Sequence, residues 1–238
     1  MKYDDFKEIE ECYDITIIYS VILGSMCWGY NNIYSDWDVK FIYIYNNYDS
    51  HDLKHYNKDI SIQFSKDNID FEGWELGKFL NAHYQHDFNT FEMLNYGIIL
   101  RNSNLLNYLP RFSKKALKNR YKRAFKKHYN RYIKQKNIDN WKKLKKLIIT
   151  LRYACNYIAL SNNQYPPQNI NQLTSNYADV SCINCINDYK NCIINKNYHN
   201  IINWLENMLN YNAHTTLSNT KHDFNDYVKI FHKGIDLE

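Results

Sequence analysis

The segment GSMCWGYNNIYSDWDVKF, Gly24–Phe41, decides the fold of this chain. Its Gly-Ser pair directly follows ITIIYSVIL, a β-branched apolar run that is typical of a buried strand. Its Asp-x-Asp motif, Asp36 and Asp38, leads into a second run of this kind, VKFIYIY. Side chains two positions apart on a strand point to one face, so the two carboxylates are predicted to lie together. Gly24 and Ser25 are predicted to form a turn whose backbone N–H groups and hydroxyl approach the phosphates of a nucleotide.

A third carboxylate is predicted on a neighbouring strand. The sequence IDFE precedes the helical pattern GWELGKFL, and we choose Asp70 from it. Glu72 points to the same strand face and is the alternative. Carboxylate oxygens are ligands that Mg²⁺ prefers, and two such ions can hold the attacking and leaving oxygens of a phosphoryl transfer. Asp36, Asp38 and Asp70 are therefore the predicted catalytic and metal-binding residues, with Asp70 also expected to accept the proton of the attacking hydroxyl.

Working outward from this segment, the hydrophobic patterns predict an α+β fold, with strands in the first part of the chain and a helical half after them. Apolar and β-branched runs predict strands at 14–23, 39–45, 60–64 and 69–72. Helical spacing predicts helices at 3–13, 74–84, 88–94, 113–135, 139–161, 178–195 and 199–211. The tail after Asn212 is polar and is expected to be partly disordered.

Glycine placement divides the sequence. Five of the six glycines lie in the first 97 residues, and the next is Gly234. Because glycine supplies tight turns, strands and loops are expected in the first part and mainly helices in the second. We therefore predict a catalytic domain at 1–108 and a helical C-terminal domain at 109–238 that carries a basic block.

Charge is distributed very unevenly. From Arg111 to Lys146 there are 16 Lys/Arg and one acid, whereas the remaining sequence holds 14 Lys/Arg and 24 Asp/Glu. An acidic body with one basic block points to a polyanionic partner, and contact with a nucleic-acid backbone would be steeply salt-dependent. Aromatic residues between the cations recur at helical spacing and are predicted to face the core. The candidate nucleic-acid-binding residues are Lys122, Arg123, Lys126, Lys127, Lys145 and Lys146.

These segments resemble the DNA polymerase β-type nucleotidyltransferases, whose signature is Gly-Ser, then Asp-x-Asp, then a third Asp. The chain is more specifically similar to the predicted nucleotidyltransferases of the YcgL and RlaP (RNA-ligase-associated) type. The matching segments are GSMCWGYNNIYSDWDVKFIY, DFEGWELGKFL, FNTFEML and KKLIITLRYACNYIALSNNQYPPQNINQL. They occur in the family's order, which makes the resemblance specific.

The resemblance implies a polymerase β-like palm, in which the strands form a small mixed β-sheet that bears the metal site and a helical half closes over the nucleotide. By position, it implies that Gly24 and Ser25 contact the triphosphate. Lys78 and Arg152 match basic positions of the family and are implied to bind phosphate. The family has Arg directly after Gly-Ser, whereas this chain has Met26, so another cation must replace it or nucleotide binding must be weaker.

The predicted reaction moves a nucleoside monophosphate from an NTP, with ATP expected as donor and Mg²⁺ or Mn²⁺ as cofactor, to an acceptor hydroxyl. RNA, as a tRNA or an RNA 3′ end, is the expected acceptor because of the basic block and the RNA-ligase-associated relatives. Protein nucleotidylation (AMPylation), as in toxin–antitoxin relatives, is the alternative. A small-molecule acceptor and a non-catalytic nucleic-acid-binding module also stay open.

Two further patterns bear on location and on metals. The acidic N-terminus MKYDDFKEIEE lacks the pattern of an export signal, and no apolar run approaches the ~18 residues of a membrane span, so a cytoplasmic protein without a membrane segment is expected. Cys182, Cys185, Cys192 and His199 have spacing compatible with zinc. On a helix, however, the three cysteines share one side, so we expect a buried apolar face there.

Overall fold

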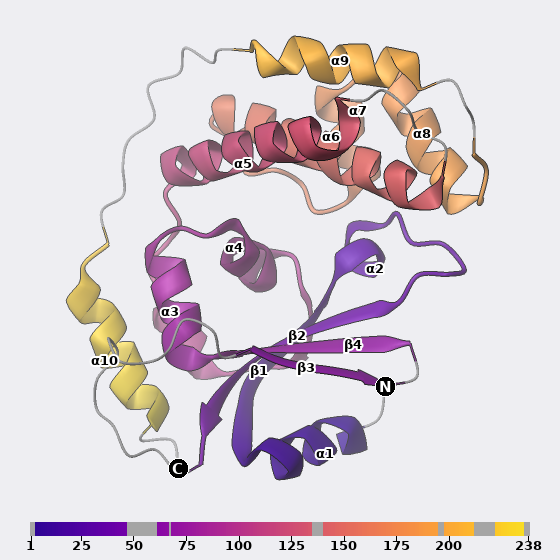
Figure 1. The fold of residues 1–238 in the computed structure, drawn as a ribbon. Coiled ribbons are helices and arrows are strands. Elements are labelled where there is room, and N and C mark those ends of the chain that lie inside the picture. Colours follow the sequence, from indigo (N-terminus) through magenta and orange to yellow (C-terminus); the bar gives the residue numbers. More distant parts are fainter. Residues whose placement is uncertain are drawn as a thin grey trace. The chain divides into compact units, whose positions relative to one another are not determined.

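The computed structural model describes residues 3–46, 61–66, 68–134, 140–194, 198–211 and 222–235. The chain forms two compact units that interleave along the sequence (Figure 1). The first unit comprises 1–24, 36–112 and 220–238, and the second comprises 25–35 and 113–219. The α+β class is confirmed. The division into domains 1–108 and 109–238 stays a prediction.

The first unit is built on a five-stranded sheet with the order β3-β4-β2-β1-β5. Its strands are β1 Ile15–Leu23, β2 Trp37–Tyr45, β3 Ser61–Lys66, β4 Ile69–Glu75 and β5 Ile98–Arg101. β2 and β4 run parallel, and the other neighbouring strands run antiparallel. The sheet is therefore mixed, as predicted.

Helices cover both faces of this sheet, which explains why its central strands are almost continuously apolar. α1, Tyr3–Tyr13, lies on one side, where the rings of Phe6 and Phe71 meet edge-on at 6.0 Å (Figure 1). α3, Leu76–Tyr84, and α4, Phe88–Asn95, lie on the other side. The hydroxyl of Tyr19 in β1 donates to the backbone carbonyl of Met93 in α4 at 3.1 Å.

α3 begins two residues later than the pattern predicts. Trp74 and Glu75 still belong to β4, and Glu75 then caps the helix by accepting a hydrogen bond from the backbone N–H of Lys78 at 2.9 Å. A side-chain acceptor at this position satisfies an N–H that the first helical turn leaves without a partner. The cap thereby places Lys78 in the first turn of α3.

The tail after Asn212, which was expected to be partly disordered, contains a helix, α10, Phe224–Ile235. Residues 212–221 and 236–238 lie outside the described residues. Tyr227, Ile230 and Phe231 recur at helical spacing and are buried. α10 packs on α3, where the Tyr84 ring lies 5.5 Å from the ring of Tyr227. The partner of this apolar stripe, α3, is distant in sequence, so the spacing alone does not show what the stripe packs against.

A chain of hydrogen bonds joins α10 to α3. Nε2 of His222 lies 2.8 Å from the carbonyl oxygen of Arg111, which can only accept, so this nitrogen carries a hydrogen. In neutral His222, Nδ1 is then an acceptor for the Tyr227 hydroxyl at 2.6 Å. The Tyr227 oxygen in turn accepts from Nδ1 of His83 at 2.7 Å. Nε2 of His83 is buried and has no hydrogen-bond partner among the described residues.

We expect this chain to make the protein sensitive to mild acid. Burial, followed by the charges of His222 and His86, lowers the pKa of His83 from 6.5 to about 3. Above pH 6.5 the His83 imidazole is neutral in both states and has little effect on stability. Below pH 6.5 it binds a proton in the unfolded chain but stays neutral in the folded chain, which favours unfolding. Lowering the pH from 7 to 5 should reduce the free energy of unfolding by about 2 kcal/mol through His83. Urea unfolding at both pH values measures this.

The matched variant is His83→Asn, because its amide nitrogen can still donate to Tyr227 while it does not titrate. The variant should lose most of this pH dependence, whereas His232→Asn on the outer part of α10 should keep it. An unchanged slope in His83→Asn would show that other groups cause the acid sensitivity.

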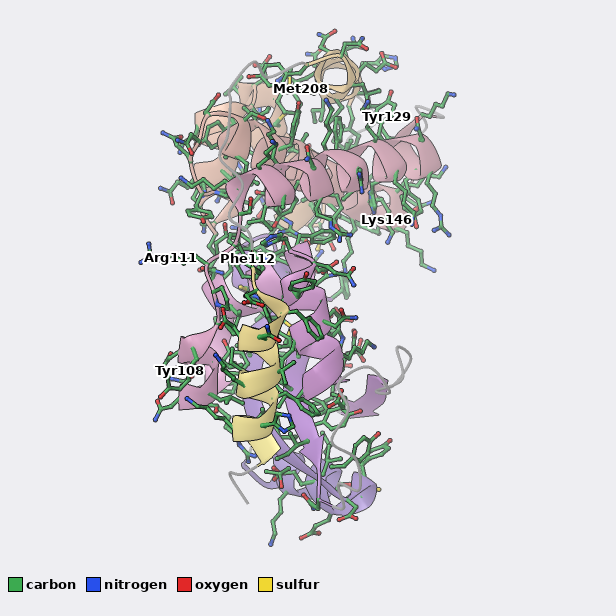
Figure 2. The ribbon with its side chains drawn as sticks, turned by 90° about the vertical axis from the view of Figure 1, so that its left-hand side faces the viewer. Tyr108, Arg111, Phe112, Tyr129, Lys146 and Met208 are labelled. Carbon is green, nitrogen blue, oxygen red and sulfur yellow. The ribbon has the colours of Figure 1, made fainter. Side chains whose placement is uncertain are left out.

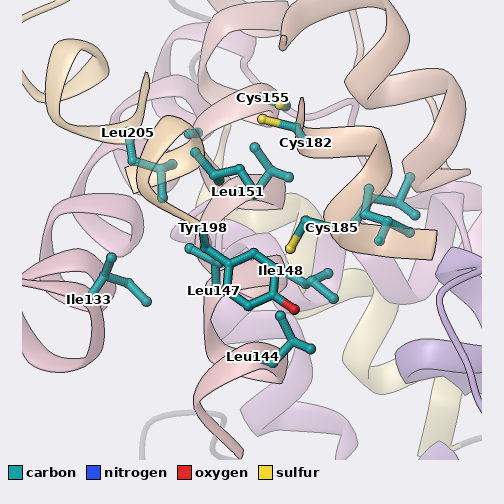
Figure 3. Packing of buried hydrophobic residues seen from close by; sticks show 14 of the residues in the cluster. Ile133, Leu144, Leu147, Ile148, Leu151, Cys155, Cys182, Cys185, Tyr198 and Leu205 are labelled. Atoms are coloured by element: carbon teal, nitrogen blue, oxygen red, sulfur yellow. The ribbon is translucent and has the colours of Figure 1, made fainter. Parts of the chain in front are cut away.

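The second unit is helical. Its elements are α2 Gly24–Trp28, α5 Lys114–His128, the π-helical turn Tyr129–Ile133, α6 Trp141–Ser161, α7 Ile170–Tyr177, α8 Val180–Lys190 and α9 His199–Leu209. Leu147, Ile148 and Leu151 of α6 lie at the centre of its hydrophobic core, with Cys182 and Cys185 of α8 beside them (Figure 3). Cys182 and Cys185 are buried as predicted, and burial raises the pKa of Cys182 to about 12. The prediction was wrong for Cys192, which lies beyond the end of α8 with a left-handed backbone and is only half-buried.

α6 spans 21 residues, but its first turns carry four lysines. Neither α6 nor any other helix among the described residues has the length and apolar character to pass through a bilayer.

Candidate active site

Asp38 and Asp70 face each other across adjacent parallel strands. β2 and β4 pair in a register that sets Asp38 opposite Asp70 and, two residues on, Lys40 opposite Glu72. Directly opposed residues in a sheet point to the same face, so the two carboxylates lie on one side of the sheet. Asp38 is half-buried and Asp70 is exposed. Asp36, also half-buried, immediately precedes β2. The structure therefore brings together carboxylates from two separate stretches of sequence.

Gly24 closes one side of this group. It follows Leu23, which pairs with Asp38 across β1 and β2, and it has the left-handed backbone angle φ of +70°. A Cβ atom at this position would overlap Oδ2 of Asp38 and would lie only 2.7 Å from its Cγ. The carboxylate of Asp38 thus rests against the Gly24 backbone, which only glycine permits.

Glu72, the alternative third carboxylate, is engaged elsewhere. It forms an ion pair with Lys40 and accepts a hydrogen bond from the indole N–H of Trp74 at 2.8 Å. Burial alone would raise the pKa of Glu72, but the hydrogen bonds from Lys40 and Trp74 outweigh it and hold the pKa below its ordinary value. Glu72 therefore neutralises Lys40, whereas Asp70 lies directly opposite Asp38, which makes Asp70 the better candidate for the metal site.

Lys78, in the first turn of α3, lies near Trp74 and Glu72. Its ammonium nitrogen is 5.2 Å from the centre of the Trp74 ring, and its charge helps to lower the pKa of Glu72. A strand rises about 3.3 Å per residue, so Trp74 is roughly 13 Å along the backbone from Asp70. The structure thus associates Lys78 with the Lys40–Glu72 pair.

Ser25 and Arg152, the other predicted phosphate contacts, belong to the second unit. Cζ of Arg152 lies 3.6 Å from the ring centre of Trp28, the last residue of the short helix that contains Ser25. Both side chains are buried, with exposed fractions of 2% for Ser25 and 3% for Arg152. The Ser25 hydroxyl makes no hydrogen bond within the part of the chain that the structure describes. The sequence analysis did not predict that Trp28 contacts Arg152. An aromatic residue one helical turn after Ser25 could have indicated a stacking partner for a cation.

The carboxylates fit a divalent metal that arrives with its substrate. Among the described residues, no three His, Cys, Asp or Glu side chains could hold a metal ion together. The opposed Asp38 and Asp70 supply two hard oxygen donors. Mg²⁺ is commonly bound through one or two carboxylates, with water and substrate phosphates completing its coordination. The arrangement therefore suits a triphosphate-bound ion better than an ion in a closed protein cage.

Comparison with known families agrees with this geometry. The sequence model of RlaP, the RNA repair pathway DNA polymerase beta family, matches residues 1–224. The chain belongs to this family. The chain is therefore a member of a DNA polymerase beta family, as the sequence motifs predict. Members of such families generally take a nucleoside triphosphate as substrate and use a divalent metal.

Two individual proteins are also similar to this RlaP-family chain. "Uncharacterized protein YcgL" of Bacillus subtilis (strain 168) is 32% identical over 96 residues, which cover 40% of this chain and 36% of that protein. The match thus spans little more than a third of the relative's length. A nucleotidyltransferase-like protein from Exiguobacterium sibiricum 255-15, known from a crystal structure, aligns with a TM-score of 0.33 and 11% identity over 86% of this chain and 71% of that chain.

Proposed function

We propose that this RlaP-family protein transfers a nucleoside monophosphate from a metal-bound NTP to a hydroxyl group of RNA. The observation that carries the proposal is the opposition of Asp38 and Asp70 on adjacent strands beside Gly24. Two carboxylates on one face of a sheet suit a divalent ion that carries the reacting phosphate of a nucleotide. The backbone turn beside them has no side chain to keep that phosphate away. We propose ATP as the donor and Mg²⁺, or Mn²⁺, as the ion.

The three carboxylates take separate roles in this proposal. Asp36 and Asp38 hold the metal, and Asp70 completes the site and accepts the proton of the attacking hydroxyl. When bound, the metal neutralises charge that develops on the phosphate oxygens. Gly24 lets the triphosphate approach the backbone, and Ser25, Lys78 and Arg152 are proposed phosphate contacts. Positioning and charge neutralisation then supply most of the rate acceleration.

The proposed RNA contact rests on the outer side of α5 and the start of α6. α5 buries Leu117, Tyr121 and Phe125, whereas its Arg123, Lys126 and Lys127 are exposed. Lys146 of α6, which packs against α5, is labelled in Figure 2. No Asp or Glu occurs in the described segments 113–134 and 140–161 to neutralise them. A row of cations of this kind suits a phosphate backbone. The proposed contacts are Lys122, Arg123, Lys126, Lys127, Lys145 and Lys146.

The acceptor can be tested directly. Purified protein is incubated with Mg²⁺, radiolabelled NTPs and total RNA, and the labelled product is then treated with RNase or with protease. The proposal expects label that RNase removes and protease leaves in place. Label that survives RNase and is lost with protease would identify protein nucleotidylation instead, and label on neither polymer would indicate a small acceptor.

We expect the basic side of α5 to determine the salt dependence of RNA binding. Changing Arg123, Lys126 and Lys127 together to glutamine removes three exposed cations without changing the buried face of the helix. The slope of log K against log[salt] for single-stranded RNA should then fall in magnitude by about 2, since each lost phosphate contact contributes ~0.7. Fluorescence anisotropy across a salt series measures this slope.

A matched control replaces Lys7, Lys229 and Lys233, which lie on helices of the first unit, with glutamine. This control has the same change in net charge and should leave the slope nearly unchanged. Equal changes in both triple variants would mean that net charge, and not the α5 surface, determines binding.

A further inference from the structure

His128 ends α5 within the basic surface, among cations and aromatic rings. The centre of its ring lies 4.5 Å from that of Tyr132 and 5.6 Å from that of Tyr153. Arg131 and Lys146 lie 5.2 and 5.1 Å from the Tyr132 ring centre. The imidazole thus shares its surroundings with groups that bind phosphates and groups on which bases stack.

The hydrogen bonds of Thr150 determine which nitrogen of His128 carries the hydrogen. The Thr150 hydroxyl donates to the carbonyl oxygen of Lys146, one helical turn earlier, at 2.7 Å. Because a hydroxyl has one hydrogen, its contact of 2.8 Å with Nδ1 of His128 requires that Nδ1 be the donor. Nε2 of neutral His128 then carries a lone pair, and it makes no hydrogen bond to a residue that the structure describes.

The surroundings keep His128 neutral. Burial, followed by the positive charges of Lys146 and Arg131, lowers the pKa of His128 from 6.5 to about 4. At neutral pH the imidazole therefore does not add to the cationic charge around it. Since the described parts of 113–161 contain no carboxylate, Nε2 is a hydrogen-bond acceptor on a surface where the charged side chains only donate.

We propose that Nε2 of His128 accepts a hydrogen bond from a ribose 2′-hydroxyl and thereby makes this surface prefer RNA to DNA. The lysines and arginines around it recognise phosphates, which both nucleic acids share. The 2′-hydroxyl is the donor that RNA alone carries on the same backbone. Because the surrounding cations bind phosphates, a hydrogen-bond acceptor among them would lie beside the sugar–phosphate backbone, which carries the 2′-hydroxyl. This inference rests on the proposed function, because it assumes that RNA binds the α5–α6 surface.

The test compares three single strands of one sequence: RNA, its 2′-fluoro analogue and DNA. The 2′-fluoro sugar keeps the RNA-like pucker but cannot donate a hydrogen bond. The wild-type protein should bind RNA about 3- to 10-fold more tightly than the 2′-fluoro strand, as expected for one hydrogen bond. His128→Asn keeps a donor toward Thr150 but places no acceptor at the position of Nε2, and it should abolish the difference by weakening RNA binding alone. His199→Asn, at an exposed histidine of α9, should behave as wild type.

Equal binding of RNA and the 2′-fluoro strand by wild type would overturn the inference, as would a difference that persists in His128→Asn. Equal weakening of all three strands by this variant would also overturn it, because it would indicate a base contact or lost packing. The proposed function fails separately: the wild type would then bind no RNA, or its binding would not respond to the glutamine changes on α5.

Discussion

Replacing Asp38 with asparagine is expected to reduce the rate of nucleotide transfer by about 10³-fold or more, which corresponds to ~4 kcal/mol of transition-state stabilisation. The amide keeps the shape of the side chain beside Gly24 but removes the negative charge opposite Asp70. A metal-bound triphosphate then loses one of its two closely opposed carboxylates. Initial rates of label transfer at saturating Mg²⁺ measure the loss, and raised Mn²⁺ should restore only part of it.

Glu72→Gln is the informative comparison for Asp38→Asn and for Asp70→Asn. It makes the same chemical change on the same sheet face, at the carboxylate already paired with Lys40. We expect a transfer rate within about tenfold of wild type and a modest loss of stability, because the variant leaves Lys40 without its charge partner. If Glu72→Gln were as inactive as Asp38→Asn and Asp70→Asn were active, the third carboxylate would be Glu72.

Gly24→Ala should harm both the fold and the reaction. The left-handed backbone at Gly24 disfavours any side chain, which costs about 1–2 kcal/mol. The added methyl group would also overlap the carboxylate of Asp38 and force it to move. Since a displacement of about 1 Å at a reacting centre can cost ~100-fold in rate, we expect a loss of at least this size. Steady-state transfer rates and urea unfolding on the same preparation separate the two effects.

Gly29→Ala provides the matched backbone control. Gly29 has a similar φ of +78°. A Cβ atom there would lie 2.9 Å from the side-chain nitrogen of Asn169, and no carboxylate is among its nearest atoms in the described residues. Both alanine variants should lose the stability that a side chain on a left-handed backbone costs, but only Gly24→Ala should lose most of its activity. Equal activity losses would show that backbone strain, and not the contact with Asp38, accounts for the effect.

The strands and the acidic pair could be predicted because their signals are local. The runs before Gly24 and after Asp38 are β-branched and apolar, so both became strands close to their predicted bounds. The alternation of side chains also predicts that Asp36 and Asp38 share a face. What the sequence does not contain is the register between β2 and β4. That register sets Asp70, and not Glu72, opposite Asp38, and it depends on how two distant segments pair.

Elements that depend on distant partners were missed. α2 has five residues, too few for a helical period to appear, and β5 is a four-residue strand that forms against the far side of β1. α10 has its apolar stripe within a polar tail and is stabilised by α3, which lies more than a hundred residues earlier. The proton positions on His128 and His83 follow from hydrogen bonds to Thr150 and Tyr227, which no sequence spacing indicates.

The interleaving of the two units limits how this protein can be divided. Tyr30 is encoded between two strands of the sheet, yet it is 1% exposed in the core of the helical unit, where its ring meets that of Tyr189 at 6.1 Å. A fragment that starts at Ser113 would lack this ring, and the loss of a buried aromatic side chain typically costs about 3–5 kcal/mol. Neither half is therefore a transferable module, and insertions or gene fusions near residue 112 cannot exchange the helical unit without also exchanging the segment that carries Tyr30.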